Sequence, residues 1–137
     1  MPRPDDCHNQ VAHALQKDGW QITENNWYID DDFSNALYID MVARRSSNGA
    51  IPSTIYIEAK CFAVPRSTPE LHRAFGQYIT YRLILNREGF IDPLYIAVPD
   101  ETYKDYFNAS ILAVVNTYGI KLLIIDLEAE RIVEWLP

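Results

Sequence analysis

Residues 36–43 read ALYIDMVA and residues 54–62 read TIYIEAKCF, and both stretches are rich in side chains that strands favour. Between them, residues 44–52 contain Ser-Ser-Asn-Gly, a combination typical of turns. The pattern predicts an antiparallel hairpin. In the second strand, side-chain alternation predicts one face with Tyr56, Glu58 and Lys60, and an opposite face with Ile55, Ile57, Ala59 and Cys61.

The first strand of this hairpin contributes a second carboxylate. Alternation predicts Tyr38 and Asp40 on one face, with Leu37, Ile39 and Met41 on the other. Pairing of the two strands would bring Asp40 near Glu58. Mg²⁺ prefers a few carboxylate oxygens, a carbonyl and several waters. We therefore expect Mg²⁺ or Mn²⁺ to be held by Asp40, Glu58 and the Ala59 carbonyl, while Lys60 orients or helps to deprotonate an attacking water.

A purely structural interpretation of these residues stays open. Asp40, Glu58 and Lys60 could form an ion-pair group on a solvated sheet face, worth about 0–1 kcal/mol. We expect the three tryptophans to be core or sheet-packing residues rather than platforms for stacked bases.

Helices and further strands are predicted around the hairpin. A first helix begins at a cap on Asp5 or Asp6 and ends at Gly19, and short extended pieces follow at 20–23 and 27–29. After the hairpin we expect a helix from residue 67 or 68 to about 88, a strand at 94–98, a helix from about 105 to 118, and strands at 121–126 and 131–135. The sequence thus predicts a single α/β domain over residues 1–137, with a mixed sheet flanked by helices. The expected order is helix, three-strand meander, helix, strand, helix, two strands.

Composition limits the class of protein. With 137 residues and 48% hydrophobic side chains, the chain can bury a core without metals or disulfides. Cys7 and Cys61 lie far apart with no metal-binding spacing, so we expect two reduced thiols. No stretch approaches the roughly 18 apolar residues of a membrane span, and residues 1–6 do not resemble a signal peptide. The cytoplasm is the simplest predicted location, with no membrane partner.

Charge is unevenly distributed along the chain. The formal net charge of −7 argues against a protein that coats nucleic acid by bulk electrostatics. Residues 42–88, however, carry seven Lys or Arg against three Glu. This region could face a polyanion such as DNA, although the arginines could equally be scattered solvated positions. The candidate nucleic-acid contacts are Arg44, Arg45, Arg66, Arg73 and Arg82.

Asp40, followed after a turn by Glu58-Ala59-Lys60, resembles the core of the PD-(D/E)XK nuclease superfamily. Gln77 and Tyr81, four residues apart on the next helix, match the QxxxY pattern of its RecB-like branch. His8 matches the position of a further metal ligand there, although a helical histidine is as often a simple hydrogen-bonding residue. The resemblance implies a restriction-endonuclease-like fold and metal-dependent DNA cleavage, with Gln77 and Tyr81 in the catalytic centre. Two residues depart from the pattern: Ile39 replaces a proline, and Asn9 replaces a frequent acidic residue.

A wider resemblance covers nearly the whole chain. Residues 8–20, 57–60, 76–82 and 132–135 look like the XisH family, the cyanobacterial fdxN element excision controlling factors. This resemblance implies a role in programmed DNA excision during heterocyst development, together with a small companion protein, XisI. We therefore expect a DNA nuclease of this family. The alternatives are a non-catalytic regulatory protein acting with XisI, or a toxin-like nuclease restrained by XisI. A homodimer that cuts both strands is expected only by analogy.

Overall fold

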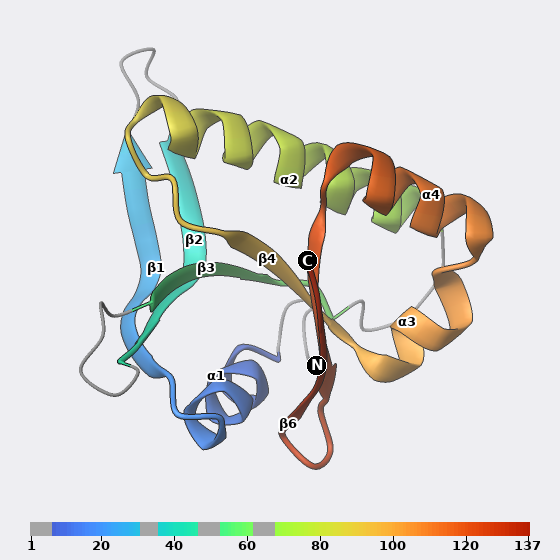
Figure 1. Ribbon diagram of the computed structural model, residues 1–137, viewed down its shortest axis with the longest axis horizontal. Coiled ribbons are helices and arrows are strands. Elements are labelled where there is room, and N and C mark those ends of the chain that lie inside the picture. Colours follow the sequence, from blue (N-terminus) through green and yellow to red (C-terminus); the bar gives the residue numbers. More distant parts are fainter. Residues whose placement is uncertain (1–6, 31–35, 47–52, 62–67) are drawn as a thin grey trace.

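The computed structural model describes residues 7–30, 36–46, 53–61 and 68–137 of the chain. Within these residues, four helices and six strands form an α/β fold with the predicted order of elements, except that one helix is split (Figure 1). The elements are α1 (His8–Lys17), β1 (Gln21–Asp30), β2 (Ala36–Arg45), β3 (Ser53–Ala59), α2 (Thr68–Arg87), β4 (Leu94–Pro99), α3 (Asp100–Tyr106), α4 (Ala109–Tyr118), β5 (Lys121–Asp126) and β6 (Arg131–Leu136). The expected caps at residues 5–6 and 67, and most of the predicted turn after β2, lie outside the described residues.

All six strands belong to one mixed sheet in sequence order, β1-β2-β3-β4-β5-β6. The β1-β2-β3 meander is antiparallel, β3, β4 and β5 are parallel, and β6 returns antiparallel to β5. Parallel neighbours need crossover connections, and α2 and the α3-α4 pair supply them. Figure 1 shows α1 on one side of the sheet and α2 and α4 on the other.

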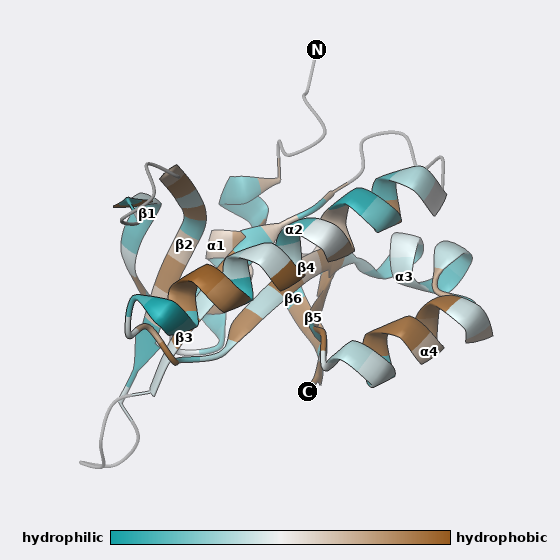
Figure 2. Cartoon of the chain, turned by 90° about the horizontal axis from the view of Figure 1, so that it is seen from above, coloured by the Kyte–Doolittle hydropathy of each residue, from teal (hydrophilic) through white to brown (hydrophobic). Residues whose placement is uncertain are grey.

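Two hydrophobic clusters cover the two faces of the sheet. The α1-side cluster includes Val11 and Leu15 of α1, and Ile57 of β3. The α2-side cluster includes Leu85 of α2 and Val115 of α4. Figure 2 shows α4 as largely hydrophobic and both ends of α2 as hydrophilic, which suits helices that lie on a core. None of the described helices is long and apolar enough to cross a membrane.

Strand β1 is longer than the sequence predicts. The polar stretch Glu24-Asn25-Asn26 was expected to separate two short extended pieces, and this prediction is wrong, because β1 pairs with β2 on both sides of it. The irregularity is local: Asn26 has a positive φ of 49°, and the β1-β2 register shifts between Ile22 and Glu24. Asparagine tolerates the left-handed conformation better than most residues, so the strand bends without ending.

Strand β2 changes its inward face at Asp40. Leu37 and Ile39 belong to the α2-side cluster, whereas Met41 belongs to the α1-side cluster. The predicted common face for these three residues is therefore wrong. The change of face occurs opposite the irregular part of β1, and the described β2-β3 pairing begins only at Met41 and Ile57. Asp40 thus lies at the point where main-chain pairing gives way to side-chain contacts.

The helix predicted over residues 105–118 is two helices. α3 ends at Tyr106, and α4 begins after Asn108, whose backbone is extended (φ −75°, ψ −177°). Asn108 Oδ1 accepts a hydrogen bond from Ile111 N at 3.0 Å, so this side chain caps α4. The apolar spacing continues across the break, which explains why periodicity alone predicts one helix.

Removal of this cap should weaken the fold modestly. We expect Asn108→Ala to lower the free energy of unfolding by about 1 kcal/mol, because Ile111 N loses its acceptor. Urea denaturation followed by circular dichroism measures the change. Asn116→Ala, at an exposed position of α4, is the matched control and should change stability by less than about 0.5 kcal/mol. Equal losses in the two variants would contradict the capping role.

Candidate functional site

The structure brings Asp40, in the middle of β2, next to Glu58, near the end of β3. Glu58 Oε1 accepts a hydrogen bond from Asp40 N at 3.0 Å, and Asp40 Oδ2 accepts one from Ala59 N at 2.8 Å. Each carboxylate thus takes a backbone N–H of the neighbouring strand where regular pairing stops. The Glu58 side chain is buried, with 5% exposure, and Asp40 is half-buried. Two acidic side chains are therefore fixed side by side in a largely desolvated place.

This donor set fits a divalent cation that keeps part of its water shell. Asp40 and Glu58 offer carboxylate oxygens, and the backbone carbonyl of Ala59 lies in the same short segment. No group of three His, Cys, Asp or Glu that could hold a metal occurs in the part of the chain that the structure describes. Mg²⁺ is typically bound by one or two carboxylates plus water and substrate oxygens, so two carboxylates suffice.

Lys60 follows Ala59 directly and lies two residues after Glu58 in the chain. β3 ends at Ala59, earlier than the predicted residue 62, but the Lys60 N–H still donates to Ala97 O at 2.8 Å. Lys60 is half-buried. As predicted, Ile55, Ile57 and Ala59 of the same strand pack in the α1-side cluster, and Cys61 packs against it.

Helix α2 contributes Gln77 and Tyr81. Gln77 Nε2 donates to the Tyr81 hydroxyl at 3.0 Å, so the two residues share one face of the helix. The pKa of Tyr81 is raised, first by burial and further by the negative charges of Glu58 and Asp40, while the Gln77 hydrogen bond acts in the opposite direction. Tyr81 therefore lies within the electrostatic field of the two carboxylates. At neutral pH its hydroxyl stays protonated, which suits a hydrogen-bond donor rather than a base.

His8 has a different environment. Its Nε2 donates to Asn25 Oδ1 at 2.8 Å, joining the first turn of α1 to β1. This hydrogen bond leaves Nδ1 as the ring nitrogen with a lone pair for a metal ion. Within the described ranges, His8 forms no three-membered metal-binding group with Asp40 and Glu58.

The arginines predicted to contact nucleic acid lie in different surroundings. Arg44, near the end of β2, and Arg73, on α2, are exposed. Arg45 Nη1 donates to both Asp18 O and Asp18 Oδ2 at 3.2 Å, so its charge is partly neutralised. Arg66 lies outside the described residues.

Arg82 braces the end of α2. Its guanidinium donates to Asp92 O at 2.7 Å, Phe90 O at 2.8 Å and Asn86 Oδ1 at 2.8 Å. These contacts hold the segment between α2 and β4. Three hydrogen bonds of the Arg82 guanidinium are therefore made within the protein. The Asp92 side chain in turn accepts a hydrogen bond from the Tyr56 hydroxyl at 3.2 Å.

Tyr56 should make stability depend on alkaline pH. Burial, followed by the charge of Asp92, raises the pKa of Tyr56 from 10.0 to about 12. The unfolded chain releases the Tyr56 hydroxyl proton near pH 10.0, whereas the folded protein keeps it to a higher pH. The contribution of Tyr56 to the free energy of unfolding is therefore fully present below pH 10.0 and is lost as pH rises toward 12. We expect Tyr56→Phe to show a shallower fall in unfolding free energy across that interval. Tyr118→Phe, at an exposed position, is the control and should keep the slope of the unsubstituted protein.

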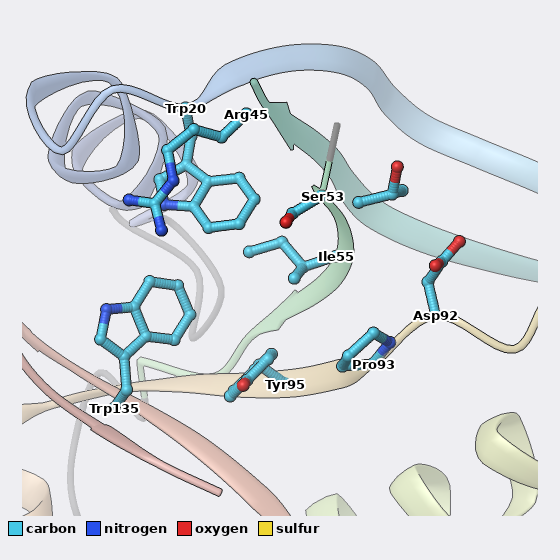
Figure 3. A pocket seen from close by; sticks show the side chains of 9 residues that line it. Trp20, Arg45, Ser53, Ile55, Asp92, Pro93, Tyr95 and Trp135 are labelled. Atoms are coloured by element: carbon cyan, nitrogen blue, oxygen red, sulfur yellow. The ribbon is translucent and has the colours of Figure 1, made fainter. Parts of the chain in front are cut away.

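A pocket of about 410 Å³ lies elsewhere, on the α1 side of the sheet (Figure 3). The Trp20 and Trp135 rings are 5.8 Å apart, and Tyr95 meets Trp135 edge-on at 5.0 Å. The Arg45 guanidinium lies 4.4 Å from the centre of the Trp20 ring, and Asp92 lines the far end. Sequence reasoning missed this pocket, because its walls come from segments distant in the chain. Asp40 and Glu58 do not line it.

The sequence predicts two reduced thiols, but Cys7 and Cys61 form a disulfide. Cys7 immediately precedes α1 and Cys61 follows Lys60, and their Cα atoms are 6.1 Å apart. This distance lies within the usual range for a disulfide. The prediction was wrong because the pairing depends on α1 packing beside the end of β3, which no local spacing reveals.

Comparison with known proteins gives the family. A family model described as XisH protein matches residues 1–133. The chain belongs to the XisH family. The segments that resemble XisH in the sequence are distributed over almost the same range, so the predicted family is confirmed.

Solved structures support the XisH assignment. An XisH family protein from Nostoc punctiforme PCC 73102 is 37% identical, with a TM-score of 0.82, and the match covers 95% of this chain and 98% of that chain. A fdxN element excision controlling factor protein from Anabaena variabilis is 33% identical, with a TM-score of 0.82, and the match covers 96% and 99% respectively. No curated protein matches the chain.

Proposed function

We propose that this XisH chain is a Mg²⁺- or Mn²⁺-dependent nuclease of the PD-(D/E)XK type that hydrolyses phosphodiester bonds in DNA. The observation that carries the proposal is the reciprocal bonding of Asp40 and Glu58 to each other's strand. Two like charges held this close repel each other, and a divalent cation between them would relieve the repulsion. A salt-bridge group on a solvated face is a poorer explanation, since Glu58 is buried.

The roles of the remaining residues follow from their positions. When bound, the cation would neutralise charge on the phosphate and acidify the attacking water. Lys60, two residues after Glu58 in the chain, would orient that water through its ammonium group. Tyr81, held by Gln77 and kept protonated, would donate a hydrogen bond to a phosphate oxygen or to the water. Arg44 and Arg73 are exposed and could contact the DNA backbone.

Lys60→Ala provides the test of this mechanism. Purified protein is incubated with single- and double-stranded DNA and Mn²⁺, beside Lys60→Ala and Lys104→Ala, the latter an exposed lysine of α3. We expect cleavage by the unsubstituted protein and by Lys104→Ala, and a loss of about 10²-fold in Lys60→Ala. Cleavage that persists unchanged in Lys60→Ala would remove the assigned role and point to a contaminating nuclease.

A non-catalytic role is the second candidate. Two of the predicted DNA-contacting arginines, Arg45 and Arg82, make hydrogen bonds within the protein, and the formal net charge is −7. In this case the chain would regulate DNA excision in the cytoplasm by binding an XisI-like companion, with catalysis supplied elsewhere. Calorimetry separates the two functions: tight binding of XisI with no affinity for Mn²⁺ favours the second.

A toxin-like nuclease restrained by XisI is the third candidate. Growth arrest on expression without XisI, abolished by Glu58→Ala, would indicate such a restrained toxin.

A further inference from the structure

The disulfide encloses the proposed centre. Cys7 and Cys61 are separated by 54 residues in the sequence, and Asp40, Glu58 and Lys60 all lie between them. Cys61 is the residue after Lys60, whose backbone N–H makes the hydrogen bond to Ala97 O at the end of β3. Cys7 is the N-cap residue of α1, and its carbonyl accepts the hydrogen bond from Val11 N at 2.9 Å. One covalent bond thus joins the start of α1 to the segment that carries Lys60.

We propose that Cys7 and Cys61 form a reversible dithiol–disulfide exchange site that positions the main chain at Lys60. The redox site itself does not depend on the nuclease activity, but its effect on catalysis rests on the proposed function. Its co-reactant is a small or protein dithiol, or the corresponding disulfide. Disulfides of cytoplasmic proteins are usually transient and catalytic or redox-sensing, so the predicted location favours a reversible bond.

The environments of the two sulfur atoms give the exchange a direction. Cys7 is buried, with 2% exposure, whereas Cys61 is half-buried. An external thiolate would therefore attack Cys61 Sγ, form a mixed disulfide and release the Cys7 thiolate at the N-terminus of α1. The accessibility of Cys61 sets this direction, and the N-terminus of α1 favours the negative charge on the departing Cys7 thiolate.

The second thiolate of the same dithiol then attacks the mixed disulfide and releases Cys61. The reducing dithiol becomes a disulfide, and the protein sulfurs gain two electrons and two protons. Oxidation follows the same steps in reverse, with the external disulfide as the electron acceptor. Reduction breaks the covalent link beside Lys60, so we expect the end of β3 to open more often.

Hydrogen exchange measures this effect without reference to activity. The protein is prepared oxidised and after dithiothreitol treatment, and thiol alkylation with mass spectrometry counts the free cysteines. We expect no free thiol in the oxidised form and two in the reduced form. The Lys60 amide should exchange about tenfold faster in the reduced form, whereas amides of Lys121–Asp126 in β5 should not change. Cys61→Ser should behave like the reduced form with or without dithiothreitol.

Two results would overturn the inference: thiols at Cys7 and Cys61 that stay free after treatment with an oxidised dithiol, or equal exchange at Lys60 in both forms. DNA cleavage assayed on the same two samples separates this inference from the proposed function. If exchange at Lys60 differs but neither form cuts DNA, the redox site stands and the nuclease proposal fails. If both forms cut DNA but exchange at Lys60 is equal, the nuclease proposal stands and the redox site fails.

Discussion

Replacing Glu58 by glutamine is expected to lower Mn²⁺-dependent DNA cleavage by at least about 10²-fold. The substitution removes one of the two charges that would hold the cation, and several kcal/mol of transition-state stabilisation would depend on that cation. Glutamine keeps an Oε1 acceptor, so the hydrogen bond from Asp40 N can persist. The fold should therefore survive, and the loss should be specific to catalysis.

Initial cleavage rates of a labelled DNA substrate measure this effect, with circular dichroism as the check on folding. Glu134→Gln is the matched control, since it makes the same chemical change at an exposed position of β6. The control should retain the rate of the unsubstituted protein. An unchanged rate in a correctly folded Glu58→Gln protein would show that this carboxylate holds no catalytic metal.

The second large effect concerns stability. We expect Leu85→Ala to lower the free energy of unfolding by about 2–5 kcal/mol, because Leu85 is fully buried (0% exposed) between α2 and the sheet. The truncation leaves a cavity under the helix that carries Gln77 and Tyr81. Leu83→Ala, on the same helix but 59% exposed, should cost less than about 0.5 kcal/mol.

Chemical denaturation of both variants, followed by tryptophan fluorescence, gives the two free energies. Similar losses at the two positions would mean that α2 is not packed on the sheet as described. A large loss at Leu85 alone would show that α2 is anchored through its buried face, and this anchoring holds Tyr81 within the electrostatic field of the two carboxylates.

Much of the candidate site could be predicted because it depends on local periodicity. In β3, the alternation of Ile55 and Ile57 with Glu58 follows from the geometry of any strand, and the structure places these residues on opposite faces. The turn signals then fix the hairpin, and pairing brings Asp40 beside Glu58. The family resemblance adds Gln77 and Tyr81, which the structure joins by a hydrogen bond.

The missed features depend on longer-range packing or on single residues within a regular pattern. Asn26 bends β1 through its own backbone conformation while pairing continues around it. Asn108 caps a helix inside a pattern that reads as continuous, and only its capping preference could have revealed the break. The Cys7–Cys61 bond depends on which side of the sheet α1 covers, and the hydrophobic pattern does not specify this choice.

The most direct measurement is anomalous diffraction from crystals soaked in Mn²⁺. The account predicts an anomalous peak between Asp40 and Glu58, within about 2.0–2.4 Å of one carboxylate oxygen of each residue. The same soak of Glu58→Gln crystals should give a much weaker peak. No peak at this position in the unsubstituted protein, or one that persists at full strength in Glu58→Gln, would contradict the claim that the two carboxylates share a metal ion.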